Sequence, residues 1–188
     1  MAEAERGQST MTPGTCSVQT GLQCAIMRLC AKVMEENMLS SRLLFELRLD
    51  VPQIVDLGDT PMGRRRIATV AGGRFHGERM NGKVEASPGG DWLLLRPDGV
   101  LMLDVRLTLR TDDDALIYMA YRGLRHGPPE VMQRLNAGES VDPASYYFRM
   151  TPTFETASQH YAWLNGIIAV GTGRREASGP IYQVHEIL

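Results

Sequence analysis

The feature that most constrains the fold is a strict alternation of apolar and other side chains along Val100–Arg110. Side chains on a β-strand point to opposite faces in turn, so an alternation of this length predicts a strand. One face carries Leu101, Leu103, Val105, Leu107 and Leu109. The other carries Met102, Asp104, Arg106, Thr108 and Arg110. Either the leucine face packs in a core and the charges meet water, or the polar face lines a barrel lumen and a helix or second subunit covers the leucines.

Similar short segments follow one another from Leu43 to the C-terminus, with turn signals at intervals of roughly 8 to 12 residues. Gly58–Gly63 is expected to form a loop, Asn81–Gly82 a hairpin turn, and Pro152 a break between strands. This spacing is typical of an all-β barrel or sandwich, and we favour a closed antiparallel barrel because closure removes exposed strand edges. The expected strands are Leu43–Leu49, Arg65–Ala71, Arg74–His76, Met80–Glu85, Trp92–Arg96, Val100–Arg110, Leu116–Tyr121, Tyr146–Met150, Thr153–Thr156, Tyr161–Val170 and Ile181–Ile187.

One segment after Leu43 has a helical pattern instead. Pro129–Leu135 begins with a proline, is followed by Gly138, and lies in a long connection between strands. Connections of this length usually have a role of their own, and a lid over a site is the common one.

The first 42 residues differ from the rest, so we expect an N-terminal extension over 1–42 and a barrel domain over 43–188. Residues 1–18 are small and polar, which predicts disorder. Apolar side chains recur at helical spacing over residues 19–37, which predicts an amphipathic helix. That helix could dock on the barrel, pair with a second chain, or have no native role if translation starts at Met34 or Met38.

Composition excludes several classes of function. The 188-residue chain has a net charge of −2 and a pI of about 6.1, so it lacks the basic surface of a nucleic-acid binder. It has no apolar run long enough for a membrane span. Cys16, Cys24 and Cys30 form no CxxC motif and the histidines have no ligand spacing, so we expect no metal site or disulfide framework, and a cytoplasmic location.

Three groups of residues are candidates for chemistry. Asp104 and Arg106 are neighbours on the polar face of Val100–Arg110. Arg149 and Glu155 share one face of Phe148–Thr156, where a buried carboxyl could act as an acid or base. Tyr161, Trp163 and Asn165 share a face of Tyr161–Val170 and could form an aromatic platform for a flat ligand. Each group also has a structural interpretation: a solvated face, an ordinary ion pair and core packing, respectively.

A series of motifs across Leu43–Leu188 is also shared with one family. They are Gly72–Gly73–Arg74–Phe75–His76–Gly77, Gly82, Gly89–Gly90–Asp91–Trp92, Arg96–Pro97–Asp98–Gly99, Leu103–Asp104–Val105–Arg106, Thr111–Asp112–Asp113, Phe154–Glu155–Thr156 and Tyr161–Ala162–Trp163–Leu164–Asn165. In these motifs the chain resembles the family called domain of unknown function 3237, or uncharacterised protein family 0311. Asp114 stands where the family pattern usually has glycine, and since aspartate tolerates a left-handed turn we expect the hairpin to form.

The resemblance implies a calycin-like, up-and-down barrel, a homodimer, and no assigned cofactor or agreed reaction. The matching polar residues form either a pocket or a buried ion-pair network that fixes the register of the barrel. They are Arg66, Asp91, Asp104, Arg106, Tyr118, Arg149, Glu155, Trp163 and Asn165.

Three functions fit these observations. The first is a cofactor-independent enzyme of isomerase, lyase, cyclase or hydrolase type acting on a small oxygenated or aromatic metabolite. In it Asp104 or Glu155 is the catalytic acid or base and Arg106 or Arg149 binds a substrate carboxylate. The second is a non-catalytic barrel that binds a small molecule. The third is a structural or partner-binding domain whose barrel is filled by side chains.

Overall fold

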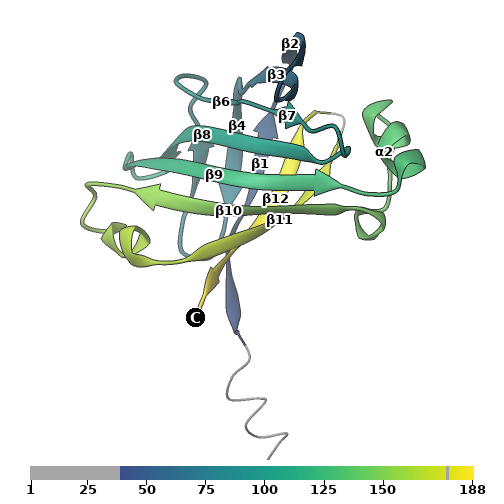
Figure 1. Ribbon diagram of the computed structural model, residues 1–188. Helices are drawn as coiled ribbons and strands as arrows, with labels where there is room; N and C mark the ends of the chain where they lie inside the picture. Colours follow the sequence, from purple (N-terminus) through teal and green to yellow (C-terminus); the bar gives the residue numbers. More distant parts are fainter. Residues whose placement is uncertain (1–38, 177) are drawn as a thin grey trace, which may run out of the picture. The chain divides into compact units, whose positions relative to one another are not determined.

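The computed structural model describes residues 39–176 and 178–188 (Figure 1). The disorder predicted for residues 1–18 and the helix predicted for residues 19–37 lie outside the described residues. Ser40–Leu188 forms one compact unit of antiparallel strands. The domain boundary at residue 42 stays a prediction.

The described chain is built almost wholly of strands. The helices are α2 (Pro129–Asn136) and the short 3-10 helices η1 (Pro143–Ser145) and η2 (Ala162–Gly166). The strands are β1 (Ser41–Asp50), β2 (Gln53–Thr60), β3 (Gly63–Thr69), β4 (Gly72–His76), β5 (Asn81–Val84), β6 (Gly90–Asp91), β7 (Leu94–Leu95), β8 (Leu101–Thr111), β9 (Leu116–His126), β10 (Tyr147–Glu155), β11 (Ala169–Arg175) and β12 (Pro180–Ile187).

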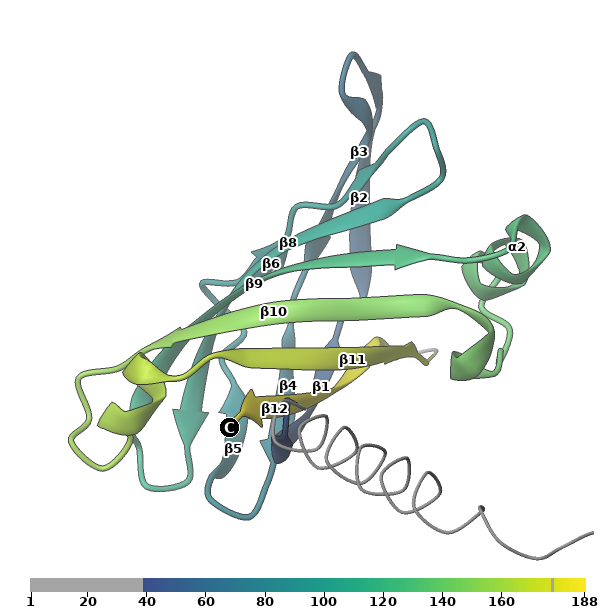
Figure 2. The same cartoon turned by 60° about the horizontal axis from the view of Figure 1, so that its bottom comes forward.

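Eight of these strands close into a ring. Their order is β8, β5, β4, β1, β12, β11, β10 and β9, and β9 pairs again with β8. Every pairing around the ring is antiparallel. Figures 1 and 2 show the strands wrapped around a common interior. The predicted all-β, closed, antiparallel up-and-down barrel is therefore confirmed.

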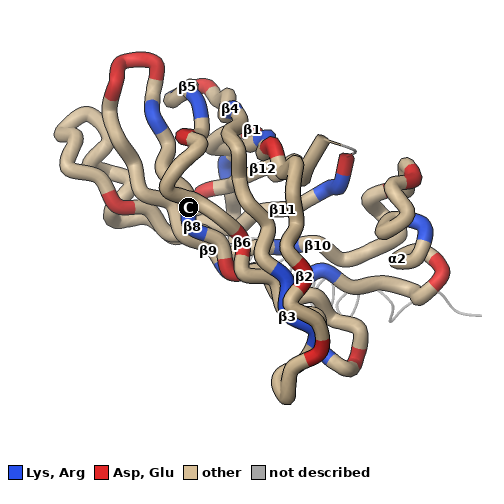
Figure 3. Tube along the Cα trace, turned by 90° about the horizontal axis from the view of Figure 1, so that it is seen from above, with Lys and Arg blue, Asp and Glu red and all other residues tan. Residues whose placement is uncertain are grey.

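The β2–β3 hairpin extends the barrel wall beyond this ring (Figure 2). It is held by β6 and β7, which pair with β3 on one side and β8 on the other. Seen from above, basic residues of β3 lie beside acidic residues of β2 (Figure 3). The loop predicted at Gly58–Gly63 is wrong in extent, since β2 runs to Thr60 and the turn is closed by the Thr60 hydroxyl donating to the Gly63 carbonyl over 2.6 Å.

The alternation along β8 separates core from surface as in the first interpretation. Its apolar face is buried from Leu101 to Leu109, while Met102 and Arg106 on the other face are exposed. β10 behaves in the same way, with Phe148, Met150 and Phe154 inside. The interpretation in which the polar face of β8 lines the lumen is therefore wrong.

Three local predictions need correction. Pro152 does not divide β10, because β11 pairs with that strand only at Arg149 and Met150, and a proline is tolerated where a strand has a free edge. Asn81–Gly82 lies inside β5 and makes no turn; Gly82 is needed there because a Cβ would lie 2.1 Å from the Arg110 carbonyl oxygen.

The third correction concerns the expected strand Tyr161–Val170. Ala162–Gly166 is a 3-10 helix, and β11 begins only at Ala169. The Asn165 side chain accepts from the Thr156 N–H over 2.8 Å and donates to the Thr156 carbonyl over 3.0 Å. These two bonds close a turn, so Tyr161, Trp163 and Asn165 do not share a strand face.

Two local predictions are confirmed. Asp114 adopts the left-handed conformation in the β8–β9 turn, with φ of 65°, so the hairpin forms without the glycine. The predicted helix at Pro129–Leu135 is α2, which begins at Pro129 and buries Leu135 against the barrel.

Candidate functional site

The barrel encloses a cavity of about 220 Å³ at the end where α2, the β11–β12 turn and the β1–β2 junction lie. Its wall is mostly apolar, with leucines from β1, β8 and α2 and Phe148 from β10. Polar side chains also line the cavity: three carboxyls, one amide, two phenol hydroxyls and three guanidinium groups. They belong to Asp91, Glu139, Glu176, Asn136, Tyr121, Tyr182, Arg66, Arg125 and Arg175.

One row of inward-facing residues forms the aromatic part of the wall. Leu101 of β8 pairs with Arg125 of β9, which pairs with Phe148 of β10. Beyond Phe148 lies Gly173 of β11, which pairs with Tyr182 of β12. A Cβ at Gly173 would lie 2.7 Å from the Phe148 ring, so this glycine leaves room for the ring. The Phe148 and Tyr182 rings meet edge to face, 5.3 Å apart.

Asp91 supplies the carboxyl that is shielded from solvent, whereas Glu139 and Glu176 at the cavity are exposed. It lies on β6 between Ala68 of β3 and Val105 of β8, both of which are buried. The backbone N–H of Asp104 donates to Asp91 Oδ1 over 3.1 Å. Burial raises the pKa of Asp91 from 3.8 to about 7, and the negative charge of Asp104 adds to this against the opposing hydrogen bond. A carboxyl with this pKa can give or take a proton at neutral pH.

Two buried tyrosines lie next to this carboxyl. The Tyr121 and Tyr182 rings are 5.4 Å apart, and both side chains are almost wholly buried. The Tyr182 hydroxyl makes no hydrogen bond of standard geometry within the described part of the chain, and the Tyr121 hydroxyl is close enough to lower its pKa as a weak donor, which leaves the Tyr182 proton free. Burial raises the pKa of both phenols, and the charge of Asp91 contributes in each case. Both hydroxyls therefore stay protonated, and the Tyr182 hydroxyl can donate to an oxygen atom of a ligand.

Three arginines bring positive charge to the cavity. Arg125 Nε is buried and has no partner among the described residues, while its Nη2 donates over 3.3 Å to Oδ1 of Asn136, the last residue of α2. Burial lowers the pKa of Arg125, and the nearby charge of Arg175 lowers it further. Arg66 Nε lies 3.3 Å from Asp56 Oδ2 but outside hydrogen-bond geometry. A buried N–H group without a protein partner can donate to water or to a ligand in the cavity.

The long connection between β9 and β10 forms part of the cavity's rim. Leu135 and Asn136 at the end of α2, and Gly138 and Glu139 just after it, line the cavity. The connection therefore lies where a lid would lie, and its movement stays a prediction.

Of the predicted site residues, the structure brings Arg66 and Asp91 together at the cavity. Asp104 and Arg106 lie on the outer face of β8 and form an ion pair of 3.0 Å, and the Arg106 guanidinium lies 5.4 Å from the centre of the Trp92 ring. The prediction that Asp104 is catalytic depended on a polar lumen, and its side chain faces away from the cavity.

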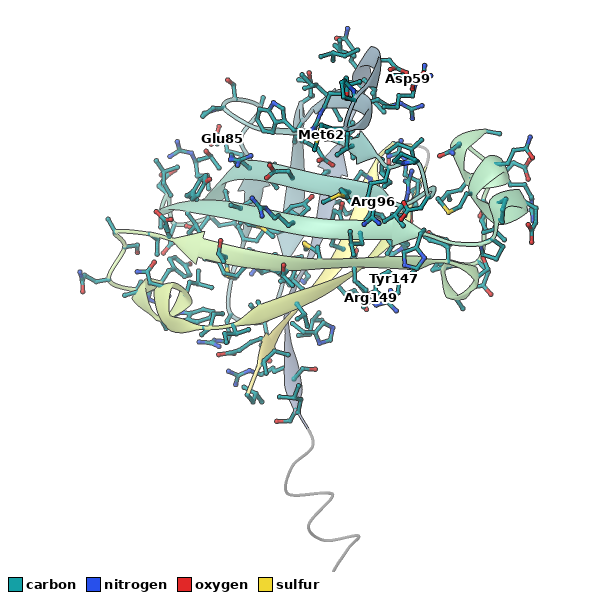
Figure 4. The ribbon with its side chains drawn as sticks, in the orientation of Figure 1. Asp59, Met62, Glu85, Arg96, Tyr147 and Arg149 are labelled. Atoms are coloured by element: carbon teal, nitrogen blue, oxygen red, sulfur yellow. The ribbon has the colours of Figure 1, made fainter. Side chains whose placement is uncertain are left out.

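The remaining predicted residues also lie outside the cavity. Tyr118 and Glu155 are exposed, and Arg149 lies over the ring of Tyr147 at 5.0 Å on the outside of β10 (Figure 4). Trp163 packs under the Arg79 guanidinium at 3.5 Å, and Arg79 in turn pairs with Glu186 at 3.1 Å. Asn165 closes the turn at Thr156, as described above. These contacts are structural in kind, and a catalytic role for Glu155 stays a prediction.

The sequence did not single out Tyr121, Tyr182, Arg125 or Arg175 as a group. Tyr121 and Arg125 could have been found from the sequence, because they lie on the same face of β9 as Ile117 and Met119. Finding Arg125 would have required extending the predicted strand past Tyr121. Within residues 39–176 and 178–188, no three His, Cys, Asp or Glu side chains gather as a metal site would require. No helix in that part of the chain is long and apolar enough to cross a membrane.

Comparison with known proteins identifies relatives over the same region. The family model described as "Protein of unknown function (DUF3237)" matches residues 39–187. A UPF0311 protein of Rhodopseudomonas palustris is 35% identical over 150 residues, which cover 80% of this chain and 97% of the relative.

Two solved structures resemble the barrel. The first, a crystal structure described as a beta-barrel like protein from Acinetobacter baumannii, has 36% identity and a TM-score of 0.71, covering 80% of this chain and 97% of that one. The second, described as an enzyme from Penicillium herquei, has 19% identity and a TM-score of 0.61 over 80% of this chain and 95% of that one. The second likeness shows a shared fold.

Proposed function

We propose, from the premise that the chain belongs to the DUF3237 family, that its cavity is the active site of an enzyme that moves a proton on a small oxygen-bearing metabolite. The proposal depends on the Asp91 carboxyl. It has a pKa of about 7 and lines the same cavity as the Tyr121 and Tyr182 side chains. Buried groups with strongly shifted pKa values concentrate at functional sites. The fungal enzyme of the same fold supports the proposal only in that such a barrel is compatible with catalysis.

The chemistry follows from the roles of the three side chains. The ionised Asp91 carboxylate takes a proton from a carbon next to a carbonyl group, and the electron pair of that C–H bond forms a carbon–carbon double bond. The carbonyl electron pair moves to the oxygen, which becomes an enolate accepting a hydrogen bond from the Tyr182 hydroxyl. Asp91, now protonated, returns the proton to a different atom for an isomerisation, or to a leaving group for an elimination.

Phenylpyruvate is a suitable probe because it combines a ring, a carboxylate and an enolisable carbonyl. Incubated with the full chain in heavy water, it should lose its C3–H signal in proton NMR faster than in the protein-free solution. Asp91→Asn should lower the rate by roughly 100- to 10,000-fold, the usual contribution of a general base. The exposed Asp112 in the β8–β9 turn provides a matched control, Asp112→Asn, which should keep the wild-type rate.

Two outcomes would contradict the proposal. If Asp104→Asn or Glu155→Gln abolished exchange while Asp91→Asn kept it, the reacting group would lie on the outer face. If phenylpyruvate stabilised the protein thermally but exchanged no faster than in buffer, the cavity would belong to a non-catalytic binding barrel. The observed cavity of about 220 Å³ argues against a barrel filled by its own side chains.

The homodimer implied by the resemblance also stays a proposal, supported by the outer side of the β2–β3 hairpin. The far edge of β2 has no strand neighbour within the described residues, and Val55 and Leu57 of this strand are exposed. Met62 in the turn that follows β2 is exposed as well (Figure 4). Exposed apolar edges of this kind commonly pair. Light scattering should give the mass of a dimer for the wild type and of a monomer for Leu57→Glu, and a monomeric wild type would refute it. The cytoplasmic location stays a prediction.

A further inference from the structure

Two of the three cavity arginines, Arg125 and Arg175, differ from Arg66, which lies 3.3 Å from Asp56. Glu186 pairs with Arg42 and Arg79, and Arg110 with Glu85, so several arginines elsewhere meet an opposite charge within 4 Å. Of the arginines that the structure describes, the exposed or half-buried Arg65, Arg74, Arg122 and Arg149 do not, but these lie outside the cavity. Among the described residues, neither Arg125 nor Arg175 has such a carboxylate partner. The nearby carboxylates of Glu139 and Glu176 are already paired with Arg134 at 2.7 Å and Arg174 at 3.4 Å.

Two cations side by side in an apolar wall are unfavourable without an anion between them. Arg125 and Arg175 both face inward, one at the end of β9 and the other at the end of β11. They are near enough for the charge of Arg175 to lower the pKa of Arg125, and both charges act on the Tyr182 hydroxyl of β12. The buried Nε of Arg125 has no acceptor in the described chain, so one N–H of its planar fork is free for a ligand oxygen.

The wall beside these arginines is aromatic. Phe148 and Tyr182 lie edge to face at 5.3 Å, and the Arg125 guanidinium lies 5.7 Å from the centre of the Phe148 ring. A dry cavity of roughly 150 Å³ is enough to hold benzene. The cavity of about 220 Å³ therefore has room for one ring with small substituents.

We infer that the ligand is a small aromatic carboxylic acid, its carboxylate held between Arg125 and Arg175 and its ring lying against Phe148 and Tyr182. The inference rests on the proposed function, because it describes the substrate of the same cavity. The carboxylate end lies at the rim near Asn136, and the ring carries the reacting group inward toward Asp91. Neutral aromatic compounds lack the anion and bind weakly.

The test uses trans-cinnamate and its neutral isostere cinnamamide, measured by isothermal titration with the full chain. Cinnamate carries no acidic C–H for Asp91, so its binding reports on the arginines independently of catalysis. The wild type should bind cinnamate at least tenfold more tightly than cinnamamide. Arg125→Gln and Arg175→Gln should each weaken cinnamate binding by roughly 10- to 100-fold, the contribution of a hydrogen bond to a charged group, and leave cinnamamide binding unchanged.

Arg122→Gln is the matched control, because Arg122 lies on the same strand as Arg125 but is exposed on the outer face. Circular dichroism melting establishes that each variant is folded. Equal affinity for cinnamate and cinnamamide overturns the inference, as do equal losses in Arg125→Gln and Arg122→Gln, or no cinnamate binding at millimolar concentration. Tighter, Arg125-dependent binding of phenyl phosphate overturns the carboxylate in favour of a phosphate ester.

The two proposals fail separately. Arginine-dependent cinnamate binding without hydrogen exchange on phenylpyruvate leaves the ligand class standing and removes the proton transfer. If phenylpyruvate exchanges its hydrogen but Arg125→Gln and Arg175→Gln do not change the affinity for cinnamate, the inferred ligand class is wrong and the catalytic proposal is retained.

Discussion

Replacing Asp91 by asparagine should make the protein more stable, and by an amount that grows with pH. In the folded barrel the pKa of Asp91 is about 7, against an ordinary value of 3.8. Between these values the folded protein keeps the proton that the unfolded chain has released, so the folded state binds more protons. Stability then falls as pH rises from about 4 to about 7, and the loss is complete above pH 7.

The size of the effect follows from the gap between the two pKa values. At about 1.4 kcal/mol per pH unit, the step from 3.8 to about 7 corresponds to roughly 4 kcal/mol. This is an upper bound, because water in the cavity solvates part of the carboxylate, and roughly 2 to 4 kcal/mol is the expected range. A chain of this length changes its melting temperature by about 2 to 4 °C per kcal/mol. Asp91→Asn should therefore melt at least about 4 °C above the wild type at pH 8.5.

The assay is a series of calorimetric melts of both proteins between pH 4 and pH 8.5 without ligand. The difference between the two matters, because other carboxyls, such as Asp56 and Glu85, have lowered pKa values and change the stability of both proteins equally. Asparagine keeps the oxygen that accepts from the Asp104 N–H, so the hydrogen bond survives. The reasoning would be refuted if the difference in melting temperature between the two proteins stayed constant from pH 4 to pH 8.5. It would also be refuted if the wild type became more stable relative to Asp91→Asn as the pH rose.

Three further predictions test the surroundings of Asp91. Arg125→Met should raise the melting temperature of the ligand-free protein by a few degrees, since a buried charge without a carboxylate partner is replaced by an apolar chain of similar length, and it should weaken cinnamate binding at least tenfold. A lower melting temperature would mean that the hydrogen bond to Asn136 outweighs the cost of the buried charge. Gly173→Ala should lower the free energy of unfolding by about 1 to 3 kcal/mol, because the new Cβ would lie 2.7 Å from the rigid Phe148 ring. Gly171→Ala should lower it less, because the new Cβ meets the flexible side chain of Met150. Equal decreases in melting temperature for the two variants would contradict this. Leu135→Ala should lower the free energy of unfolding by roughly 2 kcal/mol and speed cinnamate release in stopped-flow measurements, because the buried Leu135 side chain holds α2 against the cavity. An unchanged release rate would show that the connection between β9 and β10 does not act as a lid.

The fold was predictable from the sequence because most strands bury one face. Buried and exposed residues alternate along β8 and β10, as the apolar pattern predicted. A closed ring was expected because it leaves no strand edge unpaired. β2 was missed for the opposite reason. It extends outside the ring with nearly all its side chains exposed, so it carries no alternation to detect. η2 was misread because Tyr161 and Trp163 mimic a strand, whereas the side chain of Asn165 decides the turn.

The site was harder to predict than the fold, because the sequence does not show which way several of its side chains point. Arg66 and Asp91 could be named only because they match the family motifs. Arg125 lies four residues past the predicted end of its strand, and in a short strand a terminal arginine normally points to water. Only the closed ring, which brings β9 and β11 to one end of the barrel, shows that Arg125 and Arg175 face the same cavity as Asp91.

The family motifs left two explanations for the shared polar residues, a pocket and a structural network, and the pairing of charges bears on the choice. A network that fixes register neutralises its charges internally, as Glu186 does between Arg42 and Arg79. Asp91 and Arg125 line one cavity with opposite charges, yet no ion pair within 4 Å joins them in the described part of the chain. Each is left in a state that burial disfavours, which lowers the stability of the empty barrel. Under the proposed function a bound molecule supplies the missing partners, and for this reason we favour a pocket over a structural network.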